Sequence, residues 1–145
     1  LLIVPGVDMA RDTRTVEATG RDFPMLTPAD LREIARLAMG AQAALATGVP
    51  PSPLRAASLA GLPPAVVAVA GHDPLRNEGI AYVERLQQAG VAVDLHCCED
   101  MFHPFFGFFE VSAAARHAND AICHAFAECL PRPPALASTE RSSAR

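Results

Sequence analysis

The sequence predicts an α/β domain in which about three parallel strands form one sheet with helices packed on it. The clearest sign is a strand–helix–strand succession: an apolar run over residues 65–70, a helical pattern over 74–89 and a strand-like run over 91–97. Such a unit joins parallel strands through a right-handed crossover. The all-apolar run over residues 1–4 also suits a strand that is covered on both faces, as in a parallel sheet.

The composition fits one domain and excludes several classes of protein. The chain has 145 residues, half of them apolar, which is enough for a buried core. A formal net charge of −4 provides no basic surface for nucleic acid or for an anionic membrane. No apolar run approaches the roughly 20 residues of a membrane-spanning helix, and the first residues lack the pattern of a signal peptide.

The cysteines indicate a reducing compartment. They show no C-x-x-C spacing, and two of them are adjacent, which is too close for an ordinary disulfide. We therefore predict free, buried thiols and a cytoplasmic location. The four residues concerned are Cys97, Cys98, Cys123 and Cys129.

The first strand is expected at residues 1–4, closed by Pro5 and Gly6. The sequence starts with Leu1 inside this apolar run, which we interpret as a chain entered in mid-strand, with further strands of the sheet upstream. Residues 7–23 are polar and mixed, and they are predicted to form a long loop.

A helix is predicted to begin after Thr27, because threonine is a favoured cap, Pro28 suits the first helical position and an acidic residue follows three positions after the cap. Gly40 can end this helix. A second helical piece is expected over residues 41–46, followed by extended chain at the prolines of 50–53. The inward face of the first helix is predicted to contain Leu31, Ile34, Ala35 and Ala38.

The helix over residues 74–89 is expected to end at Gly90 and to point Ile80, Val83 and Leu86 inward. The strand that follows over residues 91–97 alternates between apolar and polar positions. A charge on one of its faces suits a strand near the edge of the sheet.

The last helix is predicted over residues 112–130. After Pro131 the composition turns to proline, serine and arginine, so residues 131–145 are expected to be a disordered tail. Residues 1–130 then form one domain, with residues 9–50 as its loop and cap-like helical material. The apolar face of the last helix is predicted to contain Ala118, Ala121, Ile122, Ala125, Phe126 and Cys129.

An acid and a histidine each follow a predicted strand. Asp73 comes just after the strand over residues 65–70, and His103 comes just after the strand that begins at residue 91. Open α/β sheets bind ligands at the carboxyl ends of their strands, where these two side chains would be neighbours. A carboxylate within about 2.6–3.2 Å of an imidazole can hold it in one tautomer and stabilise its charged form.

Each residue also has a structural reading. Asp73 before Pro74 is a favoured helix cap, and capping is compatible with a role in a cleft. His103 lies among methionine and phenylalanine residues and could simply be packed in the core. His72 could compete with it as the base. The spacing of the remaining histidines, His96, His117 and His124, predicts no metal site.

No nucleophile is recognisable in the chain. None of the serines lies in a G-x-S-x-G segment, and no glycine cluster could supply oxyanion-hole amides. A phosphate loop and a G-x-G-x-x-G segment are also missing from the sequence, so no cofactor is predicted.

Taken in order, the segments resemble the hormone-sensitive-lipase-like esterases of the α/β-hydrolase fold. The resemblance covers residues 1 to about 130, at spacing typical of that family. It rests on Pro5-Gly6-Val7-Asp8, Leu26-Thr27, Ser52-Pro53-Leu54, Leu62-Pro63-Pro64-Ala65, His72-Asp73-Pro74-Leu75-Arg76-Asn77-Glu78-Gly79, Tyr82, Leu86, Ala89-Gly90-Val91 and Met101-Phe102-His103.

The resemblance implies that Asp73 is the acid and His103 the base of a Ser-Asp-His triad. The nucleophile and oxyanion segments of the family precede the matched part, so this chain corresponds to the carboxyl-terminal half, and residues 9–50 would help line the acyl or alcohol pocket. Two departures lie next to the histidine. Pro104 and Asp100 stand where the family often has glycine, and both bear on the geometry of His103.

The expected function is therefore a half-domain of a carboxylic ester hydrolase that acts on small-molecule esters when an amino-terminal segment completes it. The chain by itself is predicted to be inactive. The alternative is a non-catalytic remnant or interaction module, which pairs through an exposed sheet edge and could form a homo-oligomer.

Overall fold

The computed structural model describes residues 1–18, 22–40, 45, 47–48 and 51–130. Three strands, four α-helices and two short 3₁₀-helices form within this part of the chain. In order they are β1 (Leu2–Ile3), α1 (Thr13–Glu17), α2 (Pro28–Met39), η2 (Pro53–Arg55), β2 (Ala65–His72), α3 (Arg76–Gln88), β3 (Val93–Phe102), η3 (Phe105–Phe108) and α4 (Ala113–Cys129).

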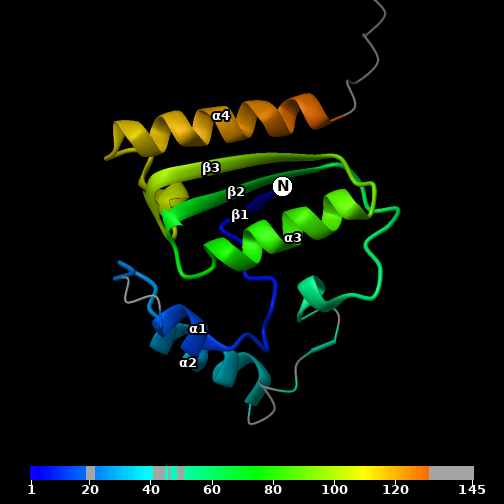
Figure 1. Cartoon of the computed structure of the whole chain (residues 1–145). Coiled ribbons are helices and arrows are strands. Elements are labelled where there is room, and N and C mark those ends of the chain that lie inside the picture. The colour runs from blue at the N-terminus through cyan, green and yellow to red at the C-terminus, as the bar shows by residue number, and fades with distance from the viewer. Residues whose placement is uncertain (19–21, 41–44, 46, 49–50, 131–145) are drawn as a thin grey trace, which may run out of the picture.

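The strands form one parallel sheet in the order β1-β2-β3, which confirms the predicted α/β class. Figure 1 shows α4 on one face of this sheet and α3 on the other, while α1 and α2 lie beyond α3, away from α4. Parallel strands need such cover on both faces because both faces are apolar.

The central strand β2 supplies the core of both layers. Its residues 66–70 are at most 1% exposed, as the continuous apolar run predicts. Val66, Ala68 and Ala70 pack with Phe105 and Ile122 on the α4 side. The alternate residues Val67 and Val69 pack with Val83 of α3 on the other face.

The amino-terminal helices only partly match the prediction. The loop expected over residues 7–23 contains α1, which Asp12 caps by accepting a hydrogen bond from the Arg14 amide. The helix expected after Thr27 is confirmed as α2, with reciprocal hydrogen bonds between Thr27 and Asp30. Its inward face is narrower than expected, since Leu31 and Ala35 are buried whereas Ile34 and Ala38 are exposed.

Two expectations near the prolines have different outcomes. Of the helical piece expected over 41–46, residues 41–44 and 46 lie outside the described residues. The chain expected to be extended at 50–53 instead enters the 3₁₀-helix η2 at Pro53. Proline fits there because its fixed φ suits the first position of a helix.

The later elements confirm the predicted βαβ unit with shifted boundaries. Helix α3 begins at Arg76, two residues after the expected start, and β3 continues to Phe102, five residues beyond the expected end. Among the described residues β3 pairs only with β2, which agrees with the predicted edge position.

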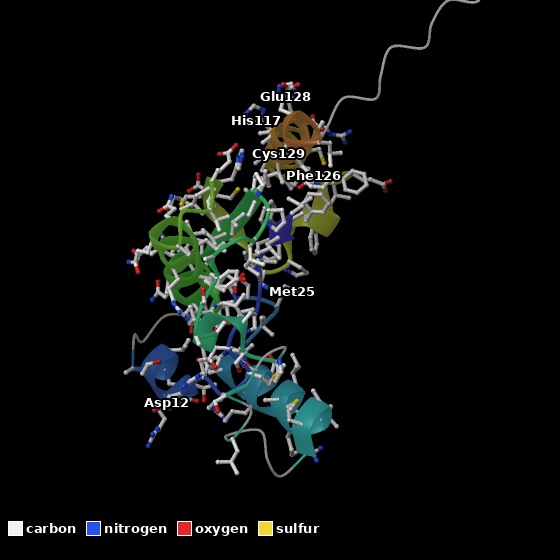
Figure 2. All side chains as sticks on the ribbon, turned by 90° about the vertical axis from the view of Figure 1, so that its right-hand side faces the viewer. Asp12, Met25, His117, Phe126, Glu128 and Cys129 are labelled. Atoms are coloured by element: carbon white, nitrogen blue, oxygen red, sulfur yellow. The ribbon has the colours of Figure 1, made fainter. Side chains whose placement is uncertain are left out.

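Helix α4 is confirmed, with Ser112 as its cap. Ile122 is buried, and Ala118, Ala125 and Phe126 pack against the same core, whereas Ala121 and Cys129 are exposed, contrary to the prediction. In Figure 2, Phe126 lies on the lower side of α4, while His117 and Glu128 lie on its outer side. The disordered tail predicted for residues 131–145 lies outside the described residues.

The four cysteines are free thiols, as predicted, but they are not buried as a group. Cys97, Cys123 and Cys129 are exposed, and only Cys98 is half-buried, on the α4 side of β3. Within the described residues, the structure contains no helix that is both long and apolar enough to cross a bilayer.

Candidate active site

The structure brings the predicted acid and base into contact. Asp73 follows the last residue of β2, and His103 follows the last residue of β3. The Nδ1 atom of His103 lies 2.9 Å from Oδ2 of Asp73, within hydrogen-bonding distance. Because a carboxylate accepts, the imidazole donates its Nδ1 proton and keeps Nε2 as an acceptor.

Asp73 is almost completely buried, with a side chain that is 1% exposed. Its second oxygen, Oδ1, accepts a hydrogen bond of 2.8 Å from the Leu75 amide, which closes the turn into α3. The prediction that Asp73 caps this helix is wrong in position, since the cap is Leu75 and the helix begins at Arg76. The carboxylate nevertheless serves both the turn and the histidine, one oxygen for each.

A change of register between β2 and β3 determines which residues meet at the strand ends. Ala70 pairs with Cys98 and His72 pairs with Phe102, so β3 carries two more residues than β2 over this interval. Without this irregularity Asp73 would continue the ladder opposite Met101 instead of His103. This irregularity is not among the predictions from the sequence, although a glycine inside a strand, here Gly71, is a recognised sign of one.

His103 is partly exposed, with 21% of its side chain accessible. Neighbouring Phe105 occupies the fully buried position in the core beside β2 and α4. His103 is therefore not packed in the core, which was the alternative interpretation of this residue. The peptide bond between His103 and Pro104 is cis, and Asp100 is exposed.

The other histidines do not join this pair. His72 is exposed at the end of β2, and His124 is exposed on α4. His96 and His117 line a shallow groove between β3 and α4. In the part of the chain that the structure describes, no three His, Cys, Asp or Glu side chains gather as ligands for a metal ion.

A cavity of about 310 Å³ lies beside Asp73. Its walls come from two parts of the chain, residues 8–16 with Phe23, and residues 73–78 at the start of α3. Thr15, Val16 and Phe23 contribute from the first segment. Part of the segment expected to line a substrate pocket is thus next to the candidate acid.

Glu78 of α3 binds the segment before α1, which forms the other wall of the cavity. This contact was not predicted from the sequence. The Oε1 atom of Glu78 accepts a hydrogen bond of 2.7 Å from the Val7 amide, and Arg11 donates to both carboxylate oxygens, at 2.6 and 2.9 Å. Both side chains of the ion pair are only 11% exposed. A buried charge is stable only when it is paired in this way.

Asp8 forms a second ion pair in the loop after β1, in which the carboxylate is buried and the Arg55 side chain is 42% exposed. Arg55 donates to its two oxygens at 2.8 Å each, and the Ala10 amide donates at 3.1 Å. Burial acts to raise the pKa of Asp8, but the hydrogen bonds and charge of Arg55, with the amide of Ala10, outweigh it and hold this pKa below its ordinary value. The pair fastens the loop to η2.

Comparison with known proteins shows the family of the chain. A family model described as the alpha/beta hydrolase fold matches residues 1–107. Esterase LipI of Mycobacterium tuberculosis is 40% identical over 106 residues, which are 71% of this chain and 32% of LipI. Carboxylic ester hydrolase LipN of the same organism is 35% identical over 136 residues, or 90% of this chain and 35% of LipN.

Solved structures show the same fold. Carboxyl esterase 2 from the mycorrhizal fungus Tuber melanosporum superposes with a TM-score of 0.78 at 27% identity, covering 90% of this chain and 44% of that protein. The chain spans about a third of the length of the two curated relatives.

Proposed function

The chain belongs to the hormone-sensitive-lipase-like branch of the α/β-hydrolase fold family, and we propose that it supplies the acid and base of a carboxylic ester hydrolase. The observation that carries the proposal is the 2.9 Å contact between His103 Nδ1 and Asp73 Oδ2 at the carboxyl ends of adjacent strands. The relatives named above are an esterase and a carboxylic ester hydrolase, which supports the same class of reaction.

In the proposed mechanism a serine hydroxyl attacks the ester carbonyl while His103 Nε2 takes its proton. Asp73 holds the imidazole through Nδ1 and stabilises the imidazolium that forms. The imidazolium then protonates the leaving alcohol, and water attacks the acyl-enzyme with His103 again as the base. We propose that the serine and the oxyanion-hole amides come from a segment outside these 145 residues, because no serine here lies in a G-x-S-x-G segment.

The substrates we propose are small-molecule esters, and residues 9–50 would contribute to the acyl or alcohol pocket. The position of Thr15, Val16 and Phe23 in the cavity beside Asp73 supports this role. Four free thiols support a reducing, cytoplasmic location.

The test is hydrolysis of p-nitrophenyl acetate and butyrate by the protein expressed with its natural upstream sequence. His103→Ala and Asp73→Asn should each lower kcat on the order of 10⁴-fold, because removal of either group disables the base. His124→Ala is the matched control, since this histidine is exposed on α4. The control should keep the parental kcat.

Two results would count against the assignment. Activity that survives both His103→Ala and Asp73→Asn would show that these residues are not the base and acid. A loss of activity in His72→Ala with normal activity in His103→Ala would instead make His72 the base.

A second candidate function is association without catalysis. Among the described residues β1 pairs only with β2, and neighbouring Leu1 is 44% exposed. An unpaired apolar strand edge can pair with another chain. Inactivity of the extended protein, together with a stable oligomer that Leu1→Lys dissociates, would favour this function.

A further inference from the structure

Asn119 is a polar side chain buried in the packing of α4. The residue is 7% exposed and faces the 3₁₀-helix η3. Its Nδ2 donates a hydrogen bond of 2.8 Å to the carbonyl oxygen of Phe106. Its Oδ1 is closed to solvent, and no described residue donates to it.

This arrangement is unfavourable for the stability of the helix packing. A buried amide oxygen without a donor loses its hydration and gains nothing in return. An apolar side chain of similar size, such as leucine, would avoid that cost and would also favour the helix. The hydrogen bond to Phe106 is therefore the interaction of the Asn119 side chain that an apolar residue could not replace.

The bond acts on the segment that carries His103. Phe106 lies three residues after the histidine, in the turn that η3 forms directly after Pro104. Phe105, the first residue of this turn, is fully buried and packs in the core with Ile122 of α4. The Gly107 amide donates to the Pro104 carbonyl at 3.2 Å, so the histidine and the turn belong to one short, tied segment.

We propose that Asn119 is a positioning residue for His103, which holds the turn after the histidine so that the imidazole stays aligned with Asp73. This inference rests on the proposed function, since it assigns the role through the reaction of His103. Asn119 itself does not contact the reacting atoms. Its contribution is to the alignment of the imidazole, and small errors of alignment at a catalytic base can cost up to about 100-fold in rate.

The test uses Asn119→Leu in the protein with its natural upstream sequence, with p-nitrophenyl butyrate as substrate. We expect kcat to fall about 10- to 100-fold while KM stays within about twofold, because alignment matters for the chemical step and not for binding. The melting temperature should be unchanged or higher, because the unsatisfied oxygen is removed.

Val83→Ala on α3 is the control for stability. Val83 is 2% exposed and packs against Val67 and Val69 on the face of the sheet opposite α4 and η3. This variant should lower the melting temperature while leaving kcat unchanged. Asn119→Leu is thus expected to lower kcat without lowering the melting temperature, and the control is expected to do the reverse.

A second variant is used in case the leucine side chain cannot pack at position 119 and the protein does not fold. Asn119→Asp keeps the shape but turns an acceptor toward the Phe106 carbonyl, so kcat should fall at least as far as in the leucine variant. We expect the proton of the His103–Asp73 hydrogen bond to give a downfield NMR signal in the parent, and this signal should weaken or broaden in both variants.

The outcomes distinguish this inference from the proposed function. A normal kcat in either Asn119 variant, or a loss of kcat that tracks a loss of melting temperature as in a merely structural role, would overturn the positioning role while His103→Ala remains inactive. If His103→Ala is fully active, the proposed function itself fails, and the inference fails with it.

Discussion

Gly71 and Glu99 approach so closely that a Cβ at position 71 would lie 1.9 Å from the Glu99 carbonyl oxygen. Side chains never approach backbone atoms to that distance, so only glycine fits. The contact lies where the register between β2 and β3 changes, between the pairs Ala70–Cys98 and His72–Phe102. This close approach therefore helps to place Asp73 beside His103.

Gly71→Ala should lower both stability and activity. The clash is with backbone, which has no rotamer to change, so the strands must separate at a cost of about 1–3 kcal/mol or more. Misalignment of Asp73 and His103 should lower kcat on the order of 100-fold. Urea unfolding and ester hydrolysis measure the two effects.

Gly48→Ala is the control for this prediction, because a Cβ there has no neighbour within 4 Å. It should change stability by less than about 1 kcal/mol. Equal unfolding midpoints for the Gly71 and Gly48 variants would contradict the proposed close approach.

Glu78→Ala should be strongly destabilising, because it leaves the Arg11 guanidinium, 11% exposed, without its carboxylate. Breaking a buried ion pair by removing one partner costs about 3–5 kcal/mol. The double variant with Arg11→Met should recover part of this loss. Denaturant unfolding of the two single variants and the double variant gives the coupling directly.

The exposed pair Arg76–Glu99 serves for comparison, since the side chain of Glu99 is 61% exposed. Glu99→Gln should cost no more than about 1 kcal/mol. If the Glu78 and Glu99 variants lose the same free energy of unfolding, burial of the Arg11–Glu78 pair does not increase its contribution to stability.

Asp8→Asn should reduce stability near neutral pH by about 1–3 kcal/mol, because Arg55 loses a charged acceptor. The folded-state pKa of Asp8 is lowered, so its contribution is fully present above the ordinary value near 3.9 and is lost as the pH falls through the lowered folded value. The parent and variant should therefore converge in acid. Urea unfolding at a series of pH values measures this.

Arg55→Met should remove most of the same pH-dependent difference, since the hydrogen bonds and the charge of Arg55 lower the pKa of Asp8 more than the Ala10 amide does. A constant gap between parent and Asp8→Asn across the acid range would show that the carboxylate is not stabilised by folding.

Cys98 should react with iodoacetamide about tenfold or more slowly than the exposed Cys123 and Cys129. Burial raises the pKa of the Cys98 thiol, and Cys97 and Glu99 raise it further. The thiolate is the reacting form, so burial and pKa act in the same direction. Mass spectrometry of peptides sampled over time follows each site, with Cys97→Ser to remove the adjacent thiol. Equal rates for Cys98 and Cys129 would contradict the described burial.

The sequence alone was sufficient for features that depend on one element at a time. The continuous apolar run of β2, the cap and proline of α2 and the spacing of α4 were readable because periodicity and caps are local. Asp73 and His103 could also be paired in advance, since each directly follows a strand and parallel strands end at the same edge.

Other features depend on how elements approach one another, and only the tertiary structure decided them. Glu78 contacts residues that are about 70 positions away, and Asp8 pairs with Arg55 across 47 positions. No local pattern marks such partners, because packing alone brings them together. The exposure of Ile34 has the same origin, since an amphipathic pattern marks a face but does not say how much of it is covered.

The carboxyl ends of β2 and β3 show both kinds of feature. The local sequence pattern predicts an acid and a histidine after two neighbouring strands. Their alignment to 2.9 Å depends on two additional residues in β3 and on the absence of a side chain at Gly71. Register is the alignment of residues on two neighbouring strands through their backbone hydrogen bonds, so it is set only when both strands have folded together.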